Sequence, residues 1–115
     1  MYKRQGGLAA HQRRQLVEYI DSQLGEAISL GQLAALCALS EYHFARMFRE
    51  SFGLPPHQYV LARRLGRARE LLRSTSQPLG DIALACGFAS ASHFTNRFRQ
   101  VSGGTPGEYR QAFLR

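Results

Sequence analysis

The amino-acid sequence predicts an all-α fold of seven helices, arranged as two helix-turn-helix subdomains that are joined by a long linker helix. Apolar residues recur at helical spacing along the chain, and no stretch alternates apolar and polar residues over the length of a strand. The segment 29–59 returns at 78–109 with a one-residue gap, and a different helical segment lies between the two copies. Because a solenoid needs roughly three or more stacked repeats to bury a continuous core, two copies indicate a tandem pair.

The first expected helix spans about residues 10–24. Leu16, Ile20 and Leu24 recur there on one stripe, which is the pattern of a helix with one buried face. The preceding residues include Lys3, Arg4 and a glycine pair, so residues 1–11 are expected to be a flexible tail or a cut linker. The other boundaries follow from the repeat: a first helix-turn-helix unit at 12–54, the linker helix at 55–74 and a second unit at 75–115.

The first copy of the repeat predicts two helices separated by a tight turn. Ser29 and Gln32 form a capping box, so one helix is expected from Leu30 to about residue 37. Ser40 caps the next helix, which ends at Gly53, since glycine readily takes the left-handed conformation of a helix stop. One face of this second helix carries Phe44, Phe48 and Phe52.

Residues 57–73 are predicted to form one long helix, which the pair Pro55 and Pro56 begins. At 1.5 Å per residue this helix measures roughly 25 Å, long enough to hold the two copies apart. Gly66 is its weakest position, because glycine inside a helix costs about 1 kcal/mol relative to alanine. The expected inward residues are Leu61, Leu65, Ala68 and Leu72, and the expected outward residues are Arg63, Arg64, Arg67 and Arg73.

The second copy repeats the pattern, with helices expected over about residues 79–86 and 91–102. Gly87 provides the turn, Gly103 the helix stop, and Pro106 the start of a terminal helix. Two positions differ between the copies. Ala38 stands where the second copy has Gly87, which predicts strain in the first turn, and Pro78 replaces the cap Ser29.

The charge of the chain favours a polyanionic partner. It carries 15 basic residues, all arginine except Lys3, against 8 acidic residues, which gives a net charge of +7 and an isoelectric point near 10.3. An arginine excess suits bidentate contact with phosphate and guanine, so nucleic acid is the favoured partner. The alternative is a basic surface that serves only solubility.

Several classes of function are disfavoured. No apolar run approaches the ~20 residues of a membrane helix, and the start of the chain lacks the apolar stretch of a signal peptide, so a soluble cytoplasmic protein is expected. Cys37 and Cys86 occupy equivalent positions in apolar helical pattern without zinc-ligand spacing, which indicates small core residues and no metal site. The sequence contains neither a phosphate-cradling loop nor a nucleophile–base pair, so neither an enzyme nor a cofactor is expected.

The second helix of each copy presents polar residues opposite its phenylalanines. At 100° per residue, the first copy projects Tyr42, Arg46 and Arg49 away from Phe44 and Phe48, with Ala45 at the edge. The second copy projects Ser92, Thr95, Asn96 and Arg99, with His93 near the start of the helix. Arginine can bridge guanine and asparagine can bridge adenine, so these residues are candidates for reading bases. An ordinary solvated face is the alternative.

Comparison of the copies favours the reading of two different DNA sequences. The buried phenylalanines and the pair Arg49/Arg99 are identical, as packing and phosphate contact require. The exposed positions differ, since Tyr42, Ala45 and Arg46 become Ser92, Thr95 and Asn96. His43 and His93 are paired as well, which favours a shared role in packing or phosphate contact.

The span from Gln12 to Arg110 resembles the DNA-binding domain of the AraC/XylS-type bacterial transcription regulators. The resemblance rests on LAALCALSEYHFARMFRESFGLPPHQYV at 33–60, on RRLGRARELL at 63–72 and on IALACGFASASHFTNRFRQVSGGTPGEYR at 82–110. The last segment is the most specific, with the spaced pair Ser92 and Phe94, the dipeptide Phe98-Arg99 and a terminal G-x-T-P-x-x-Y-R.

The resemblance implies sequence-specific binding of double-stranded DNA, with one recognition helix from each unit in adjacent segments of the major groove. It implies base contacts from Tyr42, Ala45 and Arg46 in the first unit and from Ser92, His93 and Asn96 in the second. The expected phosphate contacts are His43, Arg49, Ser90, Thr95, Arg97 and Arg99. Backbone amides at the helix starts near Leu30 and Leu79 are expected to add further anchors.

The resemblance also implies something about partners. Regulators of this family usually carry an N-terminal domain that senses a ligand and dimerises, so an effector is expected to act only through a domain that this chain lacks. The chain is then either a short stand-alone member or part of a longer regulator. Two alternatives stay open: a module that docks on RNA polymerase, and a protein that coats nucleic acid without sequence preference.

Overall fold

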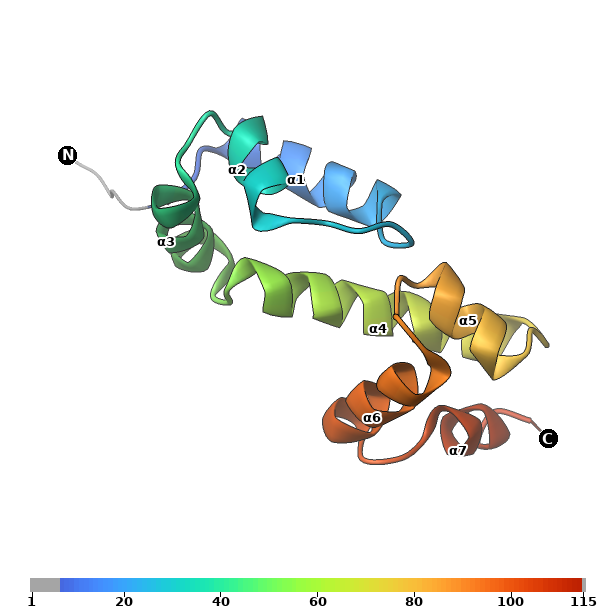
Figure 1. Ribbon diagram of the computed structural model, residues 1–115. Helices are drawn as coiled ribbons and strands as arrows, with labels where there is room; N and C mark the ends of the chain where they lie inside the picture. Colours follow the sequence, from blue (N-terminus) through green and yellow to red (C-terminus); the bar gives the residue numbers. More distant parts are fainter. Residues whose placement is uncertain (1–6, 115) are drawn as a thin grey trace. The chain divides into compact units, whose positions relative to one another are not determined.

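The structure, a computed structural model, describes residues 7–114 of the chain. This part is all α-helical, with no β-strand in it (Figure 1). The seven helices of the described residues are α1 (Ala10–Ser22), α2 (Leu30–Leu36), α3 (Glu41–Phe52), α4 (Pro56–Ser74), α5 (Leu79–Ala85), α6 (Ala91–Ser102) and α7 (Pro106–Gln111). The predicted fold class is therefore confirmed.

The described residues pack as two compact units, which divide between Ala62 and Arg63. The division falls inside α4, the predicted linker helix, which includes Gly66 without interruption. The first unit therefore contains α1, α2, α3 and the start of α4. The second unit contains the rest of α4 together with α5, α6 and α7.

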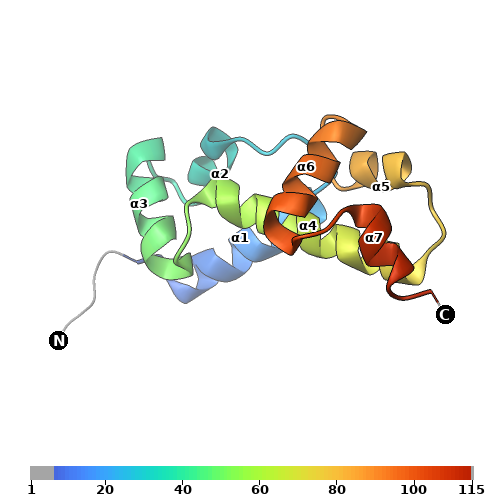
Figure 2. The ribbon, with the colours of Figure 1, turned by 90° about the horizontal axis from the view of Figure 1, so that it is seen from below.

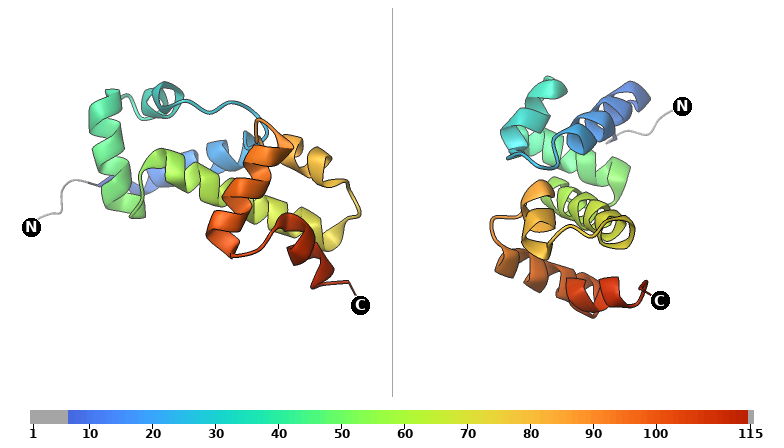
Figure 3. Two further views of the ribbon diagram at one scale, coloured as in Figure 1. Left: turned by 60° about the horizontal axis from the view of Figure 1, so that its bottom comes forward. Right: turned by 90° about the vertical axis from the view of Figure 1, so that its right-hand side faces the viewer.

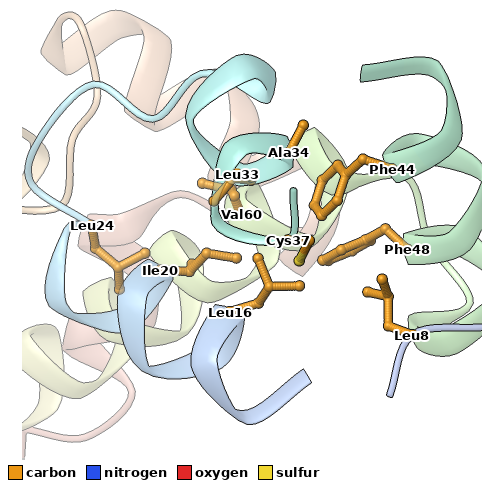
Figure 4. Close-up of a cluster of buried hydrophobic side chains, with 10 residues drawn as sticks. All are labelled: Leu8, Leu16, Ile20, Leu24, Leu33, Ala34, Cys37, Phe44, Phe48 and Val60. Atoms are coloured by element: carbon orange, nitrogen blue, oxygen red, sulfur yellow. The ribbon is translucent and has the colours of Figure 1, made fainter. Parts of the chain in front are cut away.

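The core of the first unit joins apolar stripes from all of its helices (Figure 4). The phenylalanine face of α3 supplies Phe44 and Phe48, both fully buried, and α1 supplies Leu16 and Ile20. The other buried members are Leu8, Leu24, Leu33, Ala34, Cys37 and Val60. Burying a side chain of this size contributes about 1.5 to 3 kcal/mol, so this core fixes which face of α3 points outward.

The start of the first unit differs from the expected tail at 1–11. Leu8 is buried, its backbone N–H donates to Ser51 Oγ at 2.7 Å, and its carbonyl oxygen accepts from Arg13 Nη1 at 2.6 Å. Helix α1 begins at Ala10. Residues 8–11 therefore belong to the packed unit, because an apolar side chain just before α1 reaches the core; residues 1–6 lie outside the described residues.

The core of the second unit has the same plan. Helix α6 packs against both α5 and α7 (Figure 2) and buries Phe94 and Phe98. The other buried residues of this unit are Leu65, Ala68, Leu72, Ile82, Ala83, Cys86, Phe88 and Pro106. The repeat in the sequence therefore corresponds to a repeat in the packing of each unit by itself.

Helix α4 differs from the sequence prediction at two positions. Val60 is buried and Leu61 is only half-buried, because the core of the first unit meets the helix at Val60. Arg64, expected to point outward, is half-buried, and this burial lowers the pKa of its guanidinium. Leu65, Ala68 and Leu72 are buried as expected.

A tight turn separates the two helices of each repeat, as Figure 3 shows for α2 and α3. The turns use the same hydrogen bond, from Leu39 N–H to the Ala34 carbonyl at 3.1 Å and from Phe88 N–H to the Ala83 carbonyl at 2.9 Å. Both turns need a left-handed residue, which is Ala38 at φ 55° in the first unit and Gly87 at φ 88° in the second. Ala38 thus adopts a conformation that an L side chain disfavours, which supports the predicted strain.

Hydrogen bonds from α7 hold the end of α4 in the second unit. Arg110 is half-buried and donates to three backbone carbonyls, those of Leu72 at 3.2 Å, Thr75 at 3.1 Å and Gln77 at 2.6 Å. Its neighbour Tyr109 accepts a hydrogen bond from Arg73 at 2.7 Å through its hydroxyl oxygen. One planar guanidinium therefore bonds to one carbonyl in the last turn of α4 and to two carbonyls in the loop after it.

Candidate nucleic-acid interface

Local sequence signals fix the length and rotation of α3. Ser40 accepts the backbone N–H of His43 at its Oγ and caps the start, and Gly53 ends the helix in the left-handed conformation at φ 79°. The buried Phe44 and Phe48 lie four residues apart on one face. As a result, Tyr42, Arg46 and Arg49 are exposed on the opposite side, and Ala45 is half-buried at the edge, as the sequence predicts.

Tyr42 and Arg46 lie one helical turn apart and contact each other. The guanidinium carbon of Arg46 lies over the Tyr42 ring, 6.0 Å from its centroid. The same ring meets the His43 ring edge-on at 5.8 Å, and His43 Nδ1 is 3.3 Å from Ser40 Oγ. These contacts link the cap of α3 to the arginine that the sequence singles out for base reading.

The exposed side of α3 is also its most cationic part. Arg46, Arg49, Glu50 and Gly53 line one shallow hollow on the surface of this helix. Two guanidinium groups at a hollow that is open to solvent can approach a phosphate or a base edge without moving buried groups. The arrangement therefore suits an anionic, extended partner.

Helix α6 has the same cap and the same buried face. Ser90 Oγ accepts the backbone N–H of His93 at 3.0 Å, and Gly103 ends the helix at φ 82°. Phe94 and Phe98 are buried. The predicted contact residues Ser92, His93, Asn96, Arg97 and Arg99 are exposed, and Thr95 is half-buried.

The two paired histidines have different neighbours. The His93 ring packs edge-on against the buried Phe88 at 5.7 Å, whereas the His43 ring meets the exposed Tyr42. The packing role that the sequence suggests is therefore present at His93, on the core of its unit. The position that corresponds to Phe88 in the first copy is Leu39, which offers no ring.

All twelve predicted contact residues lie on α3 and α6 or at their caps, on sides left open by the buried phenylalanines. The Arg46–Tyr42 and His93–Phe88 contacts were not predicted. The first follows from i, i+4 spacing, which brings two side chains together on a helix. The second could not be read from spacing, because it depends on how the turn before α6 folds back.

Arg97 was predicted as a phosphate contact, and the structure adds that it donates to Gln100 Oε1 at 3.3 Å.

The remaining candidate groups are buried. Cys37 and Cys86 are free thiols inside the two cores, as predicted, and burial raises the pKa of each. Arg67 and Arg64 oppose part of that rise at Cys86. Both thiols therefore stay protonated at neutral pH and are poor nucleophiles.

Within residues 7–114 no helix is long and apolar enough to span a membrane.

Comparisons with known proteins match most of the chain. A family model described as a helix-turn-helix domain matches residues 33–112. The probable transcriptional regulator LumQ of Photobacterium leiognathi is 38% identical over 97 residues, which cover 84% of this chain and 39% of LumQ. The bifunctional transcriptional activator/DNA repair enzyme AdaA of Bacillus subtilis is 35% identical over 84% of this chain and 46% of AdaA. The chain thus spans less than half the length of these relatives.

Solved structures share the fold. The DNA-binding domain of the transcriptional factor AdpA, solved in complex with a target DNA, has a TM-score of 0.83 and 30% identity, covering 87% of this chain and 90% of that one. An AraC-type DNA-binding protein from Chromobacterium violaceum also has a TM-score of 0.83, with 32% identity over 91% of this chain and 94% of that one.

Proposed function

The chain belongs to the AraC/XylS-type family of helix-turn-helix proteins, and from this premise we propose that α3 and α6 read double-stranded DNA and so regulate bacterial transcription. The two recognition helices enter adjacent segments of the major groove, one from each unit. A relative with the same fold was solved on its target DNA, which supports this use of the fold.

One observation carries the proposal. The two units keep the same buried phenylalanines, caps and helix stops in α3 and α6, yet differ at three outward positions, where Tyr42, Ala45 and Arg46 become Ser92, Thr95 and Asn96. Identical anchoring with different outward side chains fits two helices that dock alike and read different bases. A protein that coats nucleic acid without sequence preference would instead need uniformly basic helix faces, whereas α6 presents Ser92 and Asn96.

The residues divide by their chemistry. Base contacts come from Tyr42, Ala45, Arg46, Ser92, His93 and Asn96. Phosphate contacts come from His43, Arg49, Ser90, Thr95, Arg97 and Arg99. Arg49 and Arg99 have the best case for phosphate, since both are exposed in the last turn of their helices and identical in the two copies. The role is regulatory and not enzymatic, and RNA polymerase is a second, separately testable partner.

Binding to duplexes selected from a random library tests the proposal. Affinity for the selected duplex should exceed that for a scrambled duplex by on the order of a thousandfold or more, with log K falling linearly as log salt rises and no polymerase present. Replacing Arg46 and Asn96 by alanine should lower this ratio. A matched control is Arg14→Ala, which removes the same charge from an exposed position of α1 and should leave the ratio unchanged. Equal affinity for selected and scrambled duplexes would refute the proposal.

A further inference from the structure

We propose that Tyr42 is a positioning residue for Arg46: its ring confines the guanidinium, and this confinement gives the first unit its selectivity for one base pair. The inference rests on the proposed function and deepens it. It assigns Tyr42 a role that acts through another side chain, in addition to any contact that its own ring makes with DNA.

The geometry supports a direct coupling between the two side chains. Arg46 lies one turn after Tyr42, with its guanidinium carbon 6.0 Å from the centroid of the ring. Within about 6 Å the face of an aromatic ring attracts a cation. Tyr42 is 70% exposed, so the ring is not needed for the core and lies on the open side of α3.

The Tyr42 ring has a second neighbour. It meets His43 edge-on at 5.8 Å, and His43 Nδ1 lies 3.3 Å from the hydroxyl oxygen of Ser40, the residue that caps α3. Contacts of the Tyr42 and His43 rings thus connect Arg46 to Ser40 at the start of the helix. Phe44, the residue between His43 and Ala45, is fully buried and fixes this part of the backbone.

Confinement matters because an arginine must lose side-chain freedom before it can bridge a base. A free arginine side chain carries considerable rotamer entropy, which is lost on binding. A ring that restricts the guanidinium beforehand lowers that loss and favours one orientation of its planar fork. At an exposed site, the effect on discrimination should be about two- to fivefold.

The second unit shows what the arrangement adds. At the equivalent positions α6 carries Ser92 and Asn96, so the residue one turn before the base-reading residue has no ring there. Asparagine is short and has few rotamers, hence it has less need of confinement. The pairing of a long cation with an aromatic ring is thus a property of α3.

The experiment is a double-mutant cycle on DNA discrimination. The base pair read by Arg46 is first identified as the one at which Arg46→Ala lowers the preference most. At that base pair, the ratio of Kd values for the substituted and preferred duplexes is measured for wild type, Tyr42→Phe, Tyr42→Leu, Arg46→Ala and the double variant Tyr42→Leu with Arg46→Ala. Thermal unfolding is recorded for each variant, and should be unchanged because Tyr42 and Arg46 are exposed.

Tyr42→Phe keeps the ring and should keep the ratio within about twofold, whereas Tyr42→Leu should lower it about two- to fivefold. In the Arg46→Ala background the Tyr42→Leu change should have no effect on that base pair. Equal ratios for Tyr42→Leu and wild type, or the same loss with and without Arg46, would overturn the inference, since the ring would then act by itself. A wild-type protein with no preference at any base pair would instead refute the proposed function.

Discussion

Ala38 is a position at which the two units should differ in backbone conformational energy. It holds φ 55° on an exposed turn, where its equivalent Gly87 holds φ 88°. Because an L residue pays about 1 to 2 kcal/mol in this conformation, Ala38→Gly should raise the free energy of unfolding by about 1 kcal/mol, and Gly87→Ala should lower it by a similar amount. Urea unfolding of both variants measures this, and a destabilised Ala38→Gly protein would show that the turn is not strained.

Alanine substitutions at Arg46 and Arg49 should distinguish base contacts from phosphate contacts. Arg46→Ala should relax base preference at one position and cost about 1 to 3 kcal/mol there. Arg49→Ala should weaken binding to all sequences alike and reduce the slope of log K against log salt by about 1. Binding to a panel of duplexes over a salt series measures both effects. The reverse pattern would mean that α3 is rotated relative to the groove.

Individual residues were predictable where a periodic pattern fixes them. Phe44, Phe48, Phe94 and Phe98 are buried as their spacing requires, and the contact candidates lie opposite. Arg110 was not predictable, because its three carbonyl acceptors lie more than 30 residues earlier in the chain and depend on how α7 packs. Val60 and Leu61 could not be told apart for a similar reason, since adjacent apolar residues both fit a helical stripe.

At the scale of the helices, Arg110 of α7 bonds to the last turn of α4 and to the loop after it, beside the hydrogen bond between Arg73 and Tyr109. Arg110→Ala should destabilise the protein by about 2 kcal/mol, because it leaves the carbonyls of Leu72, Thr75 and Gln77 without this partner. Arg110→Lys should recover little of the loss, since an ammonium lacks the planar fork. The exposed Arg97→Ala is the control for removal of one positive charge and should stay within about 0.5 kcal/mol of wild type. Full recovery by lysine would show that charge alone matters.

The helices themselves were largely predictable, to within two residues at most ends. Caps and stops explain this success, since Ser29, Ser40 and Ser90 mark starts and Gly53 and Gly103 mark ends. Helix α1 ends at Ser22, two residues before the expected end, although Leu24 is still buried. The capping box of Thr105 and Glu108 at α7 was not foreseen, even though its spacing is visible in the sequence.

At the scale of the whole molecule, two unlike recognition helices on one chain predict an asymmetric binding site. A single chain should protect roughly 15 to 20 base pairs, with two half-sites about one helical turn, or ~34 Å, apart on one face of the DNA. The half-site read by α3 should carry more sequence information, because a charged arginine bridging guanine discriminates more strongly than the serine and histidine that α6 offers.

The measurement that tests the central claim most directly is a systematic base substitution across the selected site at fixed salt. The account predicts two clusters of sensitive base pairs about one turn apart, with the larger penalties in the cluster that Arg46→Ala abolishes and the smaller in the cluster that Asn96→Ala affects. A palindromic site occupied only by pairs of chains, or penalties that are equal in both halves or larger under α6, would contradict it.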